Sequence, residues 1–345
     1  MRNRIIVFAI VLFVCLTGFG RVFSSDEQNP PEIEIYSHPG VELVNVVAFL
    51  STIDQYSNCQ LLTSVFLYQA KKFFAPWKDH PVVQQYVILK DNEGIDEVYQ
   101  IMLEGEPWEE QAAKLEIEDE DKEQIVLFVE TLQDFAKVSH FSQYMTTMKH
   151  PYSQIASSFQ YTEHIQEELR TAQNFFGYNF HKVHVLLCPT QLYAMNSFVT
   201  INHASQKRDL FILASLSDVQ NGYLQFGTKS SFSSLLSDTV PIFLFQQAMD
   251  HYGIRMNEFQ SKTNQLFFHQ LLEALRIVVY KDTYTKIPVD DFLHQCTEKG
   301  KTFVSPIYSI IDKEYTSSRE EYVHFIAYTP HFYNSLMVLF NGGDV

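Results

Sequence analysis

The thirteen histidines are the side chains of this sequence best suited to metal binding or acid–base chemistry. His181 and His184 lie three residues apart in a strand-like segment, where that spacing places side chains on opposite faces. We therefore do not expect them to share one metal ion. Four further histidines fall in helical segments without an expected second ligand four residues later: His80, His140, His150 and His164. Neither an HExxH nor a GxSxG motif is present, so motifs alone indicate no enzyme.

A second candidate for chemistry is the acidic stretch from Glu104 to Glu123, which contains ten carboxylates and two lysines. A calcium-binding loop needs acids at alternating positions, a central glycine and a terminal glutamate. No glycine follows Gly105 in this stretch, so that spacing is not met. We therefore expect a solvated loop.

The composition excludes several other classes of function. The chain has 345 residues, of which 46% are hydrophobic, enough for one large domain or two ordinary ones. Only 12 glycines are present, and no Gly-rich phosphate-binding motif occurs. Twenty-five basic against 41 acidic side chains give a net charge of −16, which argues against binding to nucleic acid or to an anionic membrane.

The hydrophobic pattern predicts the elements that must position these residues. Helical spacing is found over residues 41–50, 61–74, 82–89, 95–103, 125–135 and 155–176. After Gly177 the pattern changes to short runs that predict strands at 182–187, 198–202 and 210–213. Two apolar helices are expected afterwards, over 240–252 and 266–280. A helical first half followed by a small sheet and further helices predicts an α+β fold.

The N-terminus has the features of a secretory signal peptide. Arg2 and Arg4 precede an apolar run over residues 5–20, which is shorter than the ~20 residues that cross a bilayer. We expect a signal peptide at 1–24, a secreted, periplasmic or cell-surface location, and no integral membrane contact after cleavage. An uncleaved anchor is the alternative. The predicted parts of the mature chain are a polar tether at 25–40, a helical part at 41–176 and a second part at 177–345.

Two regions of the sequence carry a collinear set of motifs. The first contains VELVNVVAFL at 41–50, FFAPWKDHP at 73–81 and GIDEV at 94–98. The second contains the expected strands from Lys182 to Leu213 and the two helices after them. Together they resemble a secreted bacterial domain-of-unknown-function family whose members look like gluzincin-type zinc metallopeptidases. The resemblance implies a zincin-like small sheet and helices in 177–345.

The resemblance also assigns four positions to a zinc site. In a gluzincin, two histidines one turn apart and a glutamate from a later helix bind Zn²⁺, and a glutamate beside the first histidine activates water. Phe245 and Met249 stand at the histidine positions, Gln246 at the catalytic glutamate and Gln270 at the ligand glutamate. A phenyl ring has no lone pair for zinc, a thioether suits it poorly, and an amide is no base. The family implies zinc, but the resemblance predicts no metal, cofactor or catalytic residue in this chain.

Two simpler or different interpretations of these residues remain open. Phe245 and Met249, four residues apart, also fit the core of an ordinary buried helix. Alternatively, His251, His269 and Glu273 could rebuild a metal site nearby. His251 lies two residues beyond Met249, about 200° around the helix, so we expect it to point away from the family site.

The sequence therefore predicts a secreted pseudopeptidase that binds a peptide or a protein without cutting it. One alternative is an active zinc metallopeptidase with displaced ligands. The other is a non-enzymatic surface interaction protein unrelated to peptidases.

Overall fold

The computed structural model describes most of the chain from residue 31 onward. The described residues are 31–54, 64–92, 94–115, 117, 119–192, 195–202, 207–220, 223–284 and 288–342. The expected signal peptide therefore lies outside the described residues. The chain divides into two compact units, which we call the sheet unit (31–169 and 180–243) and the helical unit (170–179 and the described residues from 244 onward). This division differs from the predicted boundary after residue 176, because the sheet belongs with the helices of the first half.

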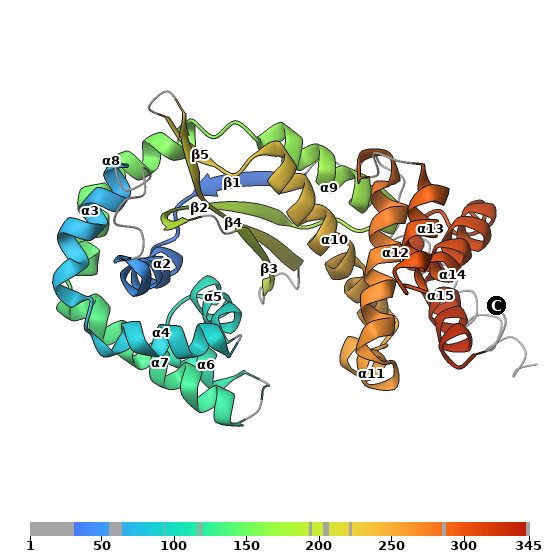
Figure 1. The fold of residues 1–345 in the computed structure, drawn as a ribbon, viewed down its shortest axis with the longest axis horizontal. Helices are drawn as coiled ribbons and strands as arrows, with labels where there is room; N and C mark the ends of the chain where they lie inside the picture. The colour runs from blue at the N-terminus through green and yellow to red at the C-terminus, as the bar shows by residue number, and fades with distance from the viewer. Residues whose placement is uncertain are drawn as a thin grey trace, which may run out of the picture. The chain divides into compact units, whose positions relative to one another are not determined.

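A five-stranded mixed sheet organises the sheet unit (Figure 1). Its parallel strands are β1 (Glu32–Tyr36), β2 (Lys182–Leu192) and β4 (Lys207–Gln220), adjacent in that order. The strands β3 (Met195–Asn202) and β5 (Tyr223–Phe226) each pair with β4 in antiparallel orientation. The three strands predicted from the sequence are confirmed, and each extends beyond its predicted range. The α+β class is confirmed with them.

The central strands β2 and β4 are apolar on both faces, as is typical of covered parallel strands. On one face Val185 lies opposite Ile212, and on the other face Leu186 lies opposite Leu213; all four side chains are fully buried. The register shifts further along β2, in the stretch that contains Pro189. Proline cannot donate a hydrogen bond to the ladder, which accounts for the irregularity there.

The strand β1 occupies part of the predicted tether at 25–40. It pairs in parallel with the start of β2, and an ion pair joins Glu34 to Lys182. The tether prediction was wrong for this segment because prolines flank the alternating EIEIY pattern and favoured a loop. The partner strand lies far away in the sequence, so nothing local showed the pairing.

Helices from the first half of the chain complete the sheet unit. They are α2 (Pro39–Thr52), α3 (Val65–Phe74), η2 (Ala75–Trp77), α4 (Pro81–Asp91), α5 (Ile95–Glu104), α6 (Trp108–Ala113), α7 (Asp119–Val138), α8 (Phe141–Ser157) and the first part of α9 (Thr162–Phe176). Helix α2 packs on β2, and α7 packs against α4, α6 and α8. The apolar side chains of α2, such as Val44 and Val47, are completely buried.

The acidic stretch at 104–123 is not the solvated loop that the sequence predicted. Helix α6 occupies residues 108–113, and α7 begins at Asp119. Both helices carry acids in their first turn, Glu109 and Glu110 in α6 and Asp119 to Asp121 in α7. Carboxylates at these positions interact favourably with the positive end of the helix dipole. Because charged residues dominate this stretch, the spacing of its few apolar residues did not indicate helices in the sequence.

Helix α10 (Lys229–His251) begins eleven residues before the predicted start at 240. Thr228 and Ser231 cap it reciprocally: the Ser231 N–H donates to Thr228 Oγ1 at 3.1 Å, and the Thr228 N–H donates to Ser231 Oγ at 2.6 Å. Pro241 lies inside the helix. The serine- and threonine-rich first turns of α10 obscured this part of the helix in the sequence pattern.

The helical unit consists of the ends of α9 and α10 and the helices that follow. These are α11 (Met256–Lys262), α12 (Gln265–Tyr284), α13 (Val289–Glu298), α14 (Val304–Ser309), the π-helical turn η3 (Ile310–Tyr315) and α15 (Phe325–Phe340). Aromatic rings form its core: Phe175 stacks on Phe325 with centroids 5.0 Å apart, and Tyr315 packs edge-on against Phe325 at 5.2 Å. The predicted helix at 266–280 is confirmed as α12.

Gly177 ends α9 with φ +74°, in the left-handed region that favours glycine. A Cβ atom at this position would lie 2.3 Å from the Cβ of His324, so no other residue fits without displacement.

Among the described residues, no helix has both the length and the apolar character that a bilayer crossing requires.

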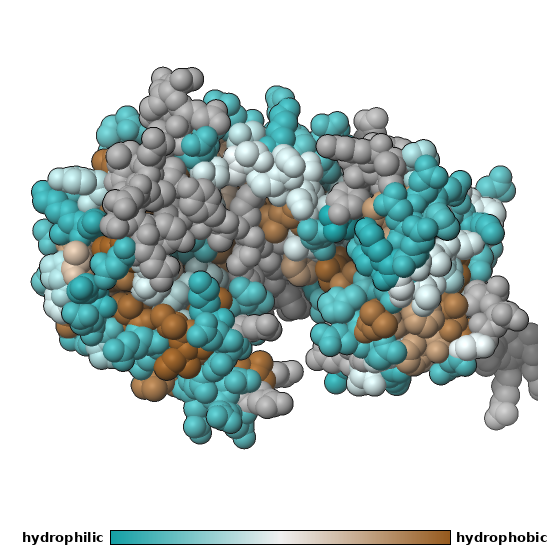
Figure 2. All heavy atoms as spheres, viewed as in Figure 1, coloured by the Kyte–Doolittle hydropathy of each residue, from teal (hydrophilic) through white to brown (hydrophobic). Residues whose placement is uncertain are grey.

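Hydrophobic surface is visible over the region of α4 and α7 in Figure 2, bordered by hydrophilic side chains. On α4, Val87 is 42% exposed and Ile88 is 52% exposed.

Candidate functional site

Two of the four positions that the resemblance assigns to a zinc site, Phe245 and Met249, lie in the core of the helical unit. Phe245 and Met249 are completely buried on α10. The Phe245 ring packs edge-on against Phe332 of α15, with centroids 5.8 Å apart. Gln246, at the position of the catalytic glutamate, is half-buried. Neither buried side chain offers a zinc ligand of the expected type, so these residues do not fit the metal that the resemblance implies.

The fourth position, Gln270 on α12, is also buried and has a structural contact. Its Oε1 accepts a hydrogen bond of 2.7 Å from the backbone N–H of Phe303, directly before α14. Its Nε2 is buried and has no hydrogen-bond partner among the described residues. A neutral amide avoids placing a charge at this site, whereas a buried glutamate without a cation would be costly. Gln270 thus links α12 to the start of α14.

The groups proposed as substitute ligands do not form a metal site. His251 and His269 are both exposed, and His251 packs edge-on against the Tyr252 ring at 4.9 Å. Glu273 forms an ion pair with Lys301, with 3.4 Å between Oε1 and Nζ. Within the described residues, no three His, Cys, Asp or Glu side chains are gathered in an arrangement that could hold a metal ion.

The structure brings His181 and His184 to the same carboxylate, contrary to the opposite-face expectation. His181 precedes β2, so the alternation of a strand does not apply to it. Its Nδ1 lies 3.0 Å from Asp209 Oδ1, and His184 Nε2 lies 4.0 Å from Asp209 Oδ2. His184 also pairs with Glu34 at 3.3 Å and stacks on Phe211. Burial lowers the pKa of His184, although Glu34 and Asp209 oppose this shift. The cluster joins β1, β2 and β4.

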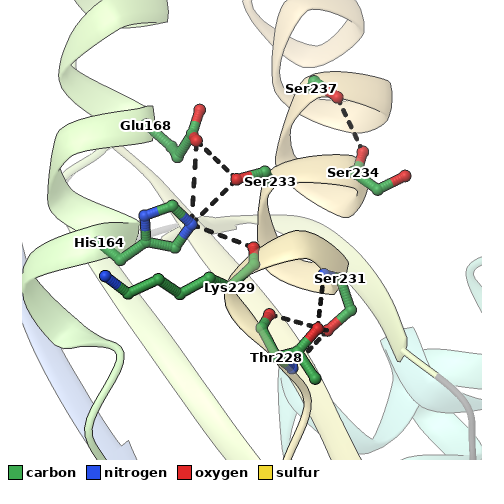
Figure 3. Close-up of polar contacts among 8 residues, drawn as sticks. All are labelled: His164, Glu168, Thr228, Lys229, Ser231, Ser233, Ser234 and Ser237. Carbon is green, nitrogen blue, oxygen red and sulfur yellow. Dashed lines mark hydrogen bonds and ion pairs between the residues drawn. The ribbon is translucent and has the colours of Figure 1, made fainter. Parts of the chain in front are cut away.

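A polar cluster near the start of α10 has the residue types of a catalytic triad (Figure 3). His164 Nε2 lies 2.9 Å from Ser233 Oγ, and Ser233 Oγ donates to Glu168 Oε1 at 2.7 Å. The same Nε2 lies 3.1 Å from the carbonyl oxygen of Lys229, which can only accept. Nε2 therefore carries a proton and donates it, so His164 is not a base for Ser233. Sequence reasoning missed Glu168 as a partner four residues after His164.

His164, Glu168 and Ser233 in Figure 3 therefore form a hydrogen-bonded contact between α9 and α10. They are not arranged as a nucleophile and its base. In a serine hydrolase, the carboxylate contacts the far side of the imidazole and orients it. Here both His164 and Glu168 contact the hydroxyl of Ser233 directly. The three side chains satisfy one another's hydrogen bonds at a half-buried position.

A buried carboxyl group in α2 has a strongly raised pKa. Glu42 is 1% exposed, and burial raises its pKa to about 7 from the usual 4.5. The Tyr152 hydroxyl donates to Glu42 Oε1 at 2.7 Å, and Asn45 Nδ2 lies 3.5 Å from Oε2. The Tyr99 hydroxyl donates to Asn45 Oδ1 at 2.8 Å. The site was not among those predicted from the sequence, although Glu42 is a single acid in the apolar run 41–50.

A groove of about 830 Å³ lies between α2, α6, α7 and α8 on the sheet unit. Leu43, Trp108 and Met145 contribute apolar surface to it. Glu106 and Glu109 contribute carboxylates at the start of α6. This combination of apolar lining and a few charged groups is typical of sites that bind a ligand or a partner segment.

The chain matches no protein-family model, no curated protein and no solved structure. The metallopeptidase resemblance therefore stays a prediction from the quoted sequence segments. Function has to be argued from the side chains and their geometry.

Proposed function

We propose that this chain is a secreted, non-catalytic protein with a metallopeptidase-like scaffold, which binds a peptide or protein without hydrolysing it. The observation that carries the proposal is the packing of Phe245, Met249 and Gln270. Two of these side chains are completely buried, and the third is tied to the backbone of Phe303.

This packing is incompatible with zinc-dependent hydrolysis at the family's site. A catalytic zinc needs several protein ligands with lone pairs and one position that water or substrate can reach. Phe245 and Met249 supply neither the ligands nor the access. Gln246 carries an amide, which cannot take a proton from water at neutral pH.

Binding of a peptide or protein is supported by the groove between α2, α6, α7 and α8. It combines an aromatic ring, aliphatic side chains and carboxylates within one hollow. Peptide-binding grooves use apolar pockets for affinity and a small number of polar groups for orientation. The Ser233 cluster gives no comparable support for hydrolysis, because His164 donates its proton there instead of accepting one.

The decisive experiment combines metal analysis with an activity assay on the purified mature chain. The protein is dialysed against Zn²⁺, its bound metal is quantified, and cleavage of quenched fluorescent peptides is followed beside an active zinc metallopeptidase. We expect substoichiometric zinc and no cleavage above background. Stoichiometric zinc together with chelator-sensitive cleavage would refute the proposal.

The displaced-ligand alternative is tested in the same assay. If cleavage were found, a His251→Ala, His269→Ala double variant would have to abolish it. Both side chains are exposed, so these changes leave the core intact. Cleavage that survives in the double variant would exclude these histidines as the ligands.

A further inference from the structure

A second hollow of about 470 Å³ lies further along α6 and α7. Glu109 lines the first hollow and Ala113 the second, one turn apart on α6. On α7, Gln133 lines the first hollow and Glu130 the second, three residues apart on one face. We call the two hollows together the α6–α7 groove.

The floor of the α6–α7 groove is apolar. Leu43, Trp108 and Met145 line its first part, and Val126 and Leu127 line its second part. Leu127 is 52% exposed, although a leucine on a packed helix is usually covered. We call these five side chains the apolar strip. A partner that covered the apolar strip would remove apolar surface from water.

The charges of the groove are predominantly negative. Five carboxylates line it, against the two lysines Lys122 and Lys137: Glu106, Glu109, Asp119, Glu123 and Glu130. Lys122 Nζ donates to the backbone carbonyl of Leu115 instead of to a carboxylate. Within the part of the chain that the structure describes, none of the five forms an ion pair. A cationic partner would therefore find carboxylates whose charge is not neutralised by the protein itself.

We propose that the α6–α7 groove docks a cationic amphipathic segment of a partner protein, with apolar side chains on the strip and Lys or Arg beside the carboxylates. From Asp119 to Lys137, α7 extends about 27 Å, which matches a helical segment of about 18 residues. An amphipathic helix presents apolar anchors on one face at spacings of three and four residues, as such a groove requires. The proposal rests on the non-catalytic binding function and names its surface and partner chemistry.

The same charges exclude an anionic lipid surface as the occupant. A membrane with acidic headgroups would be repelled by the carboxylates on both sides of the strip. An acidic peptide would be repelled for the same reason. Partner charge therefore distinguishes the proposed occupant from the others.

The test uses the full mature chain and a synthetic helical peptide of about 18 residues, with lysines on one face and leucines on the other. Trp108 lies in the groove, so a Trp77→Phe background leaves it as the reporting indole. We expect saturable binding that changes Trp108 fluorescence and weakens between roughly 0.05 M and 0.5 M salt, because exposed charges are screened. The same peptide with glutamates in place of lysines should not bind.

Charge-reversal variants locate the binding. Glu109→Lys combined with Glu130→Lys should weaken binding of the cationic peptide about tenfold or more. The matched control is Glu110→Lys combined with Glu120→Lys, which changes the total charge equally at positions that do not line the groove. The control pair should bind like wild type. Circular dichroism of both pairs checks that the helices are retained.

Three results would overturn the inference: equal loss in both variant pairs, equal binding of the acidic peptide, or no binding of the cationic one. The outcome is separate from that of the zinc and cleavage assay. A chain that neither cleaves peptides nor binds this probe would leave the proposed function standing and refute the docking surface. A chain that binds the probe and also cleaves peptides with zinc would support the docking surface and refute the proposed non-catalytic function.

Discussion

The buried carboxyl of Glu42 predicts a specific dependence of stability on pH. Its pKa is raised to about 7 in the folded chain, because burial disfavours the charged form, whereas its usual value is 4.5. Below pH 4.5 both the folded and the unfolded chain hold the proton, so the group does not change the free energy of unfolding. Between these two values the unfolded chain loses the proton first, and stability falls as pH rises.

The size of the effect follows from the two pKa values. Each unit of difference corresponds to about 1.4 kcal/mol. Glu42 therefore lowers the free energy of unfolding by about 3 kcal/mol at pH values above 7, relative to pH 4.5. This is a large fraction of the 5–15 kcal/mol that typically separates folded from unfolded chains, roughly a fifth to more than half.

The assay compares urea unfolding of wild type and Glu42→Gln from about pH 4.5 to pH 8.5. Glutamine has the shape of the protonated acid and can still accept the hydrogen bond from the Tyr152 hydroxyl. We expect the variant to gain about 3 kcal/mol relative to wild type across this range. Glu110→Gln, which removes an exposed carboxyl, is the control and should show no such gain.

A companion variant tests the cause of the shift. The Tyr152 hydroxyl donates to Glu42 Oε1 and lowers the pKa of that carboxyl, in opposition to burial. Tyr152→Phe should therefore raise the pKa of Glu42 further and move the upper end of the pH window to higher pH. A stability difference between wild type and Glu42→Gln that is the same at pH 4.5 and pH 8.5 would refute the reasoning, since Glu42 would then have the same charge in both states of the chain.

Three other substitutions test the packing by thermal or urea unfolding. Ser233→Ala removes the hydroxyl that donates to the buried Glu168 and should cost about 1–3 kcal/mol; Ser233→Thr, which keeps a hydroxyl, should retain most of the stability. Phe245→Ala should cost about 3–5 kcal/mol because it leaves a cavity in the helical unit, and a cost below 1 kcal/mol would contradict its burial. Gly177→Ala should cost at least about 1–2 kcal/mol, because its φ is +74° and a Cβ would overlap His324.

The strands of the sheet differ in how far the sequence predicts them. The runs at β2 and β4 are apolar on both faces, and burial on both faces gives this pattern directly. The strand β1 has only five residues, is flanked by prolines and pairs with a segment about 150 residues later. Its position depends on a long-range pairing, which no local propensity expresses.

The candidate sites also differ in how far the sequence predicts them. The burial of Phe245 and Met249 fits the spacing of an apolar helix, which the sequence shows directly. The environment of Glu42 depends on Tyr152, which lies 110 residues away and approaches it only in the folded chain. The groove is assembled from α2, α6, α7 and α8, so its lining cannot be found by scanning one segment.

The acidic composition of the chain takes on a more specific meaning in the structure. Local sequence shows only a dense run of carboxylates, for which a solvated loop is the ordinary expectation. In the fold, part of that run begins α6 and α7, where the helix dipoles favour negative charge. Because those two helices also frame an apolar strip, the same carboxylates come to border a groove. A loop would disperse these charges in solvent, whereas two adjacent helices hold them at fixed positions beside apolar surface, as selective recognition of a cationic partner requires.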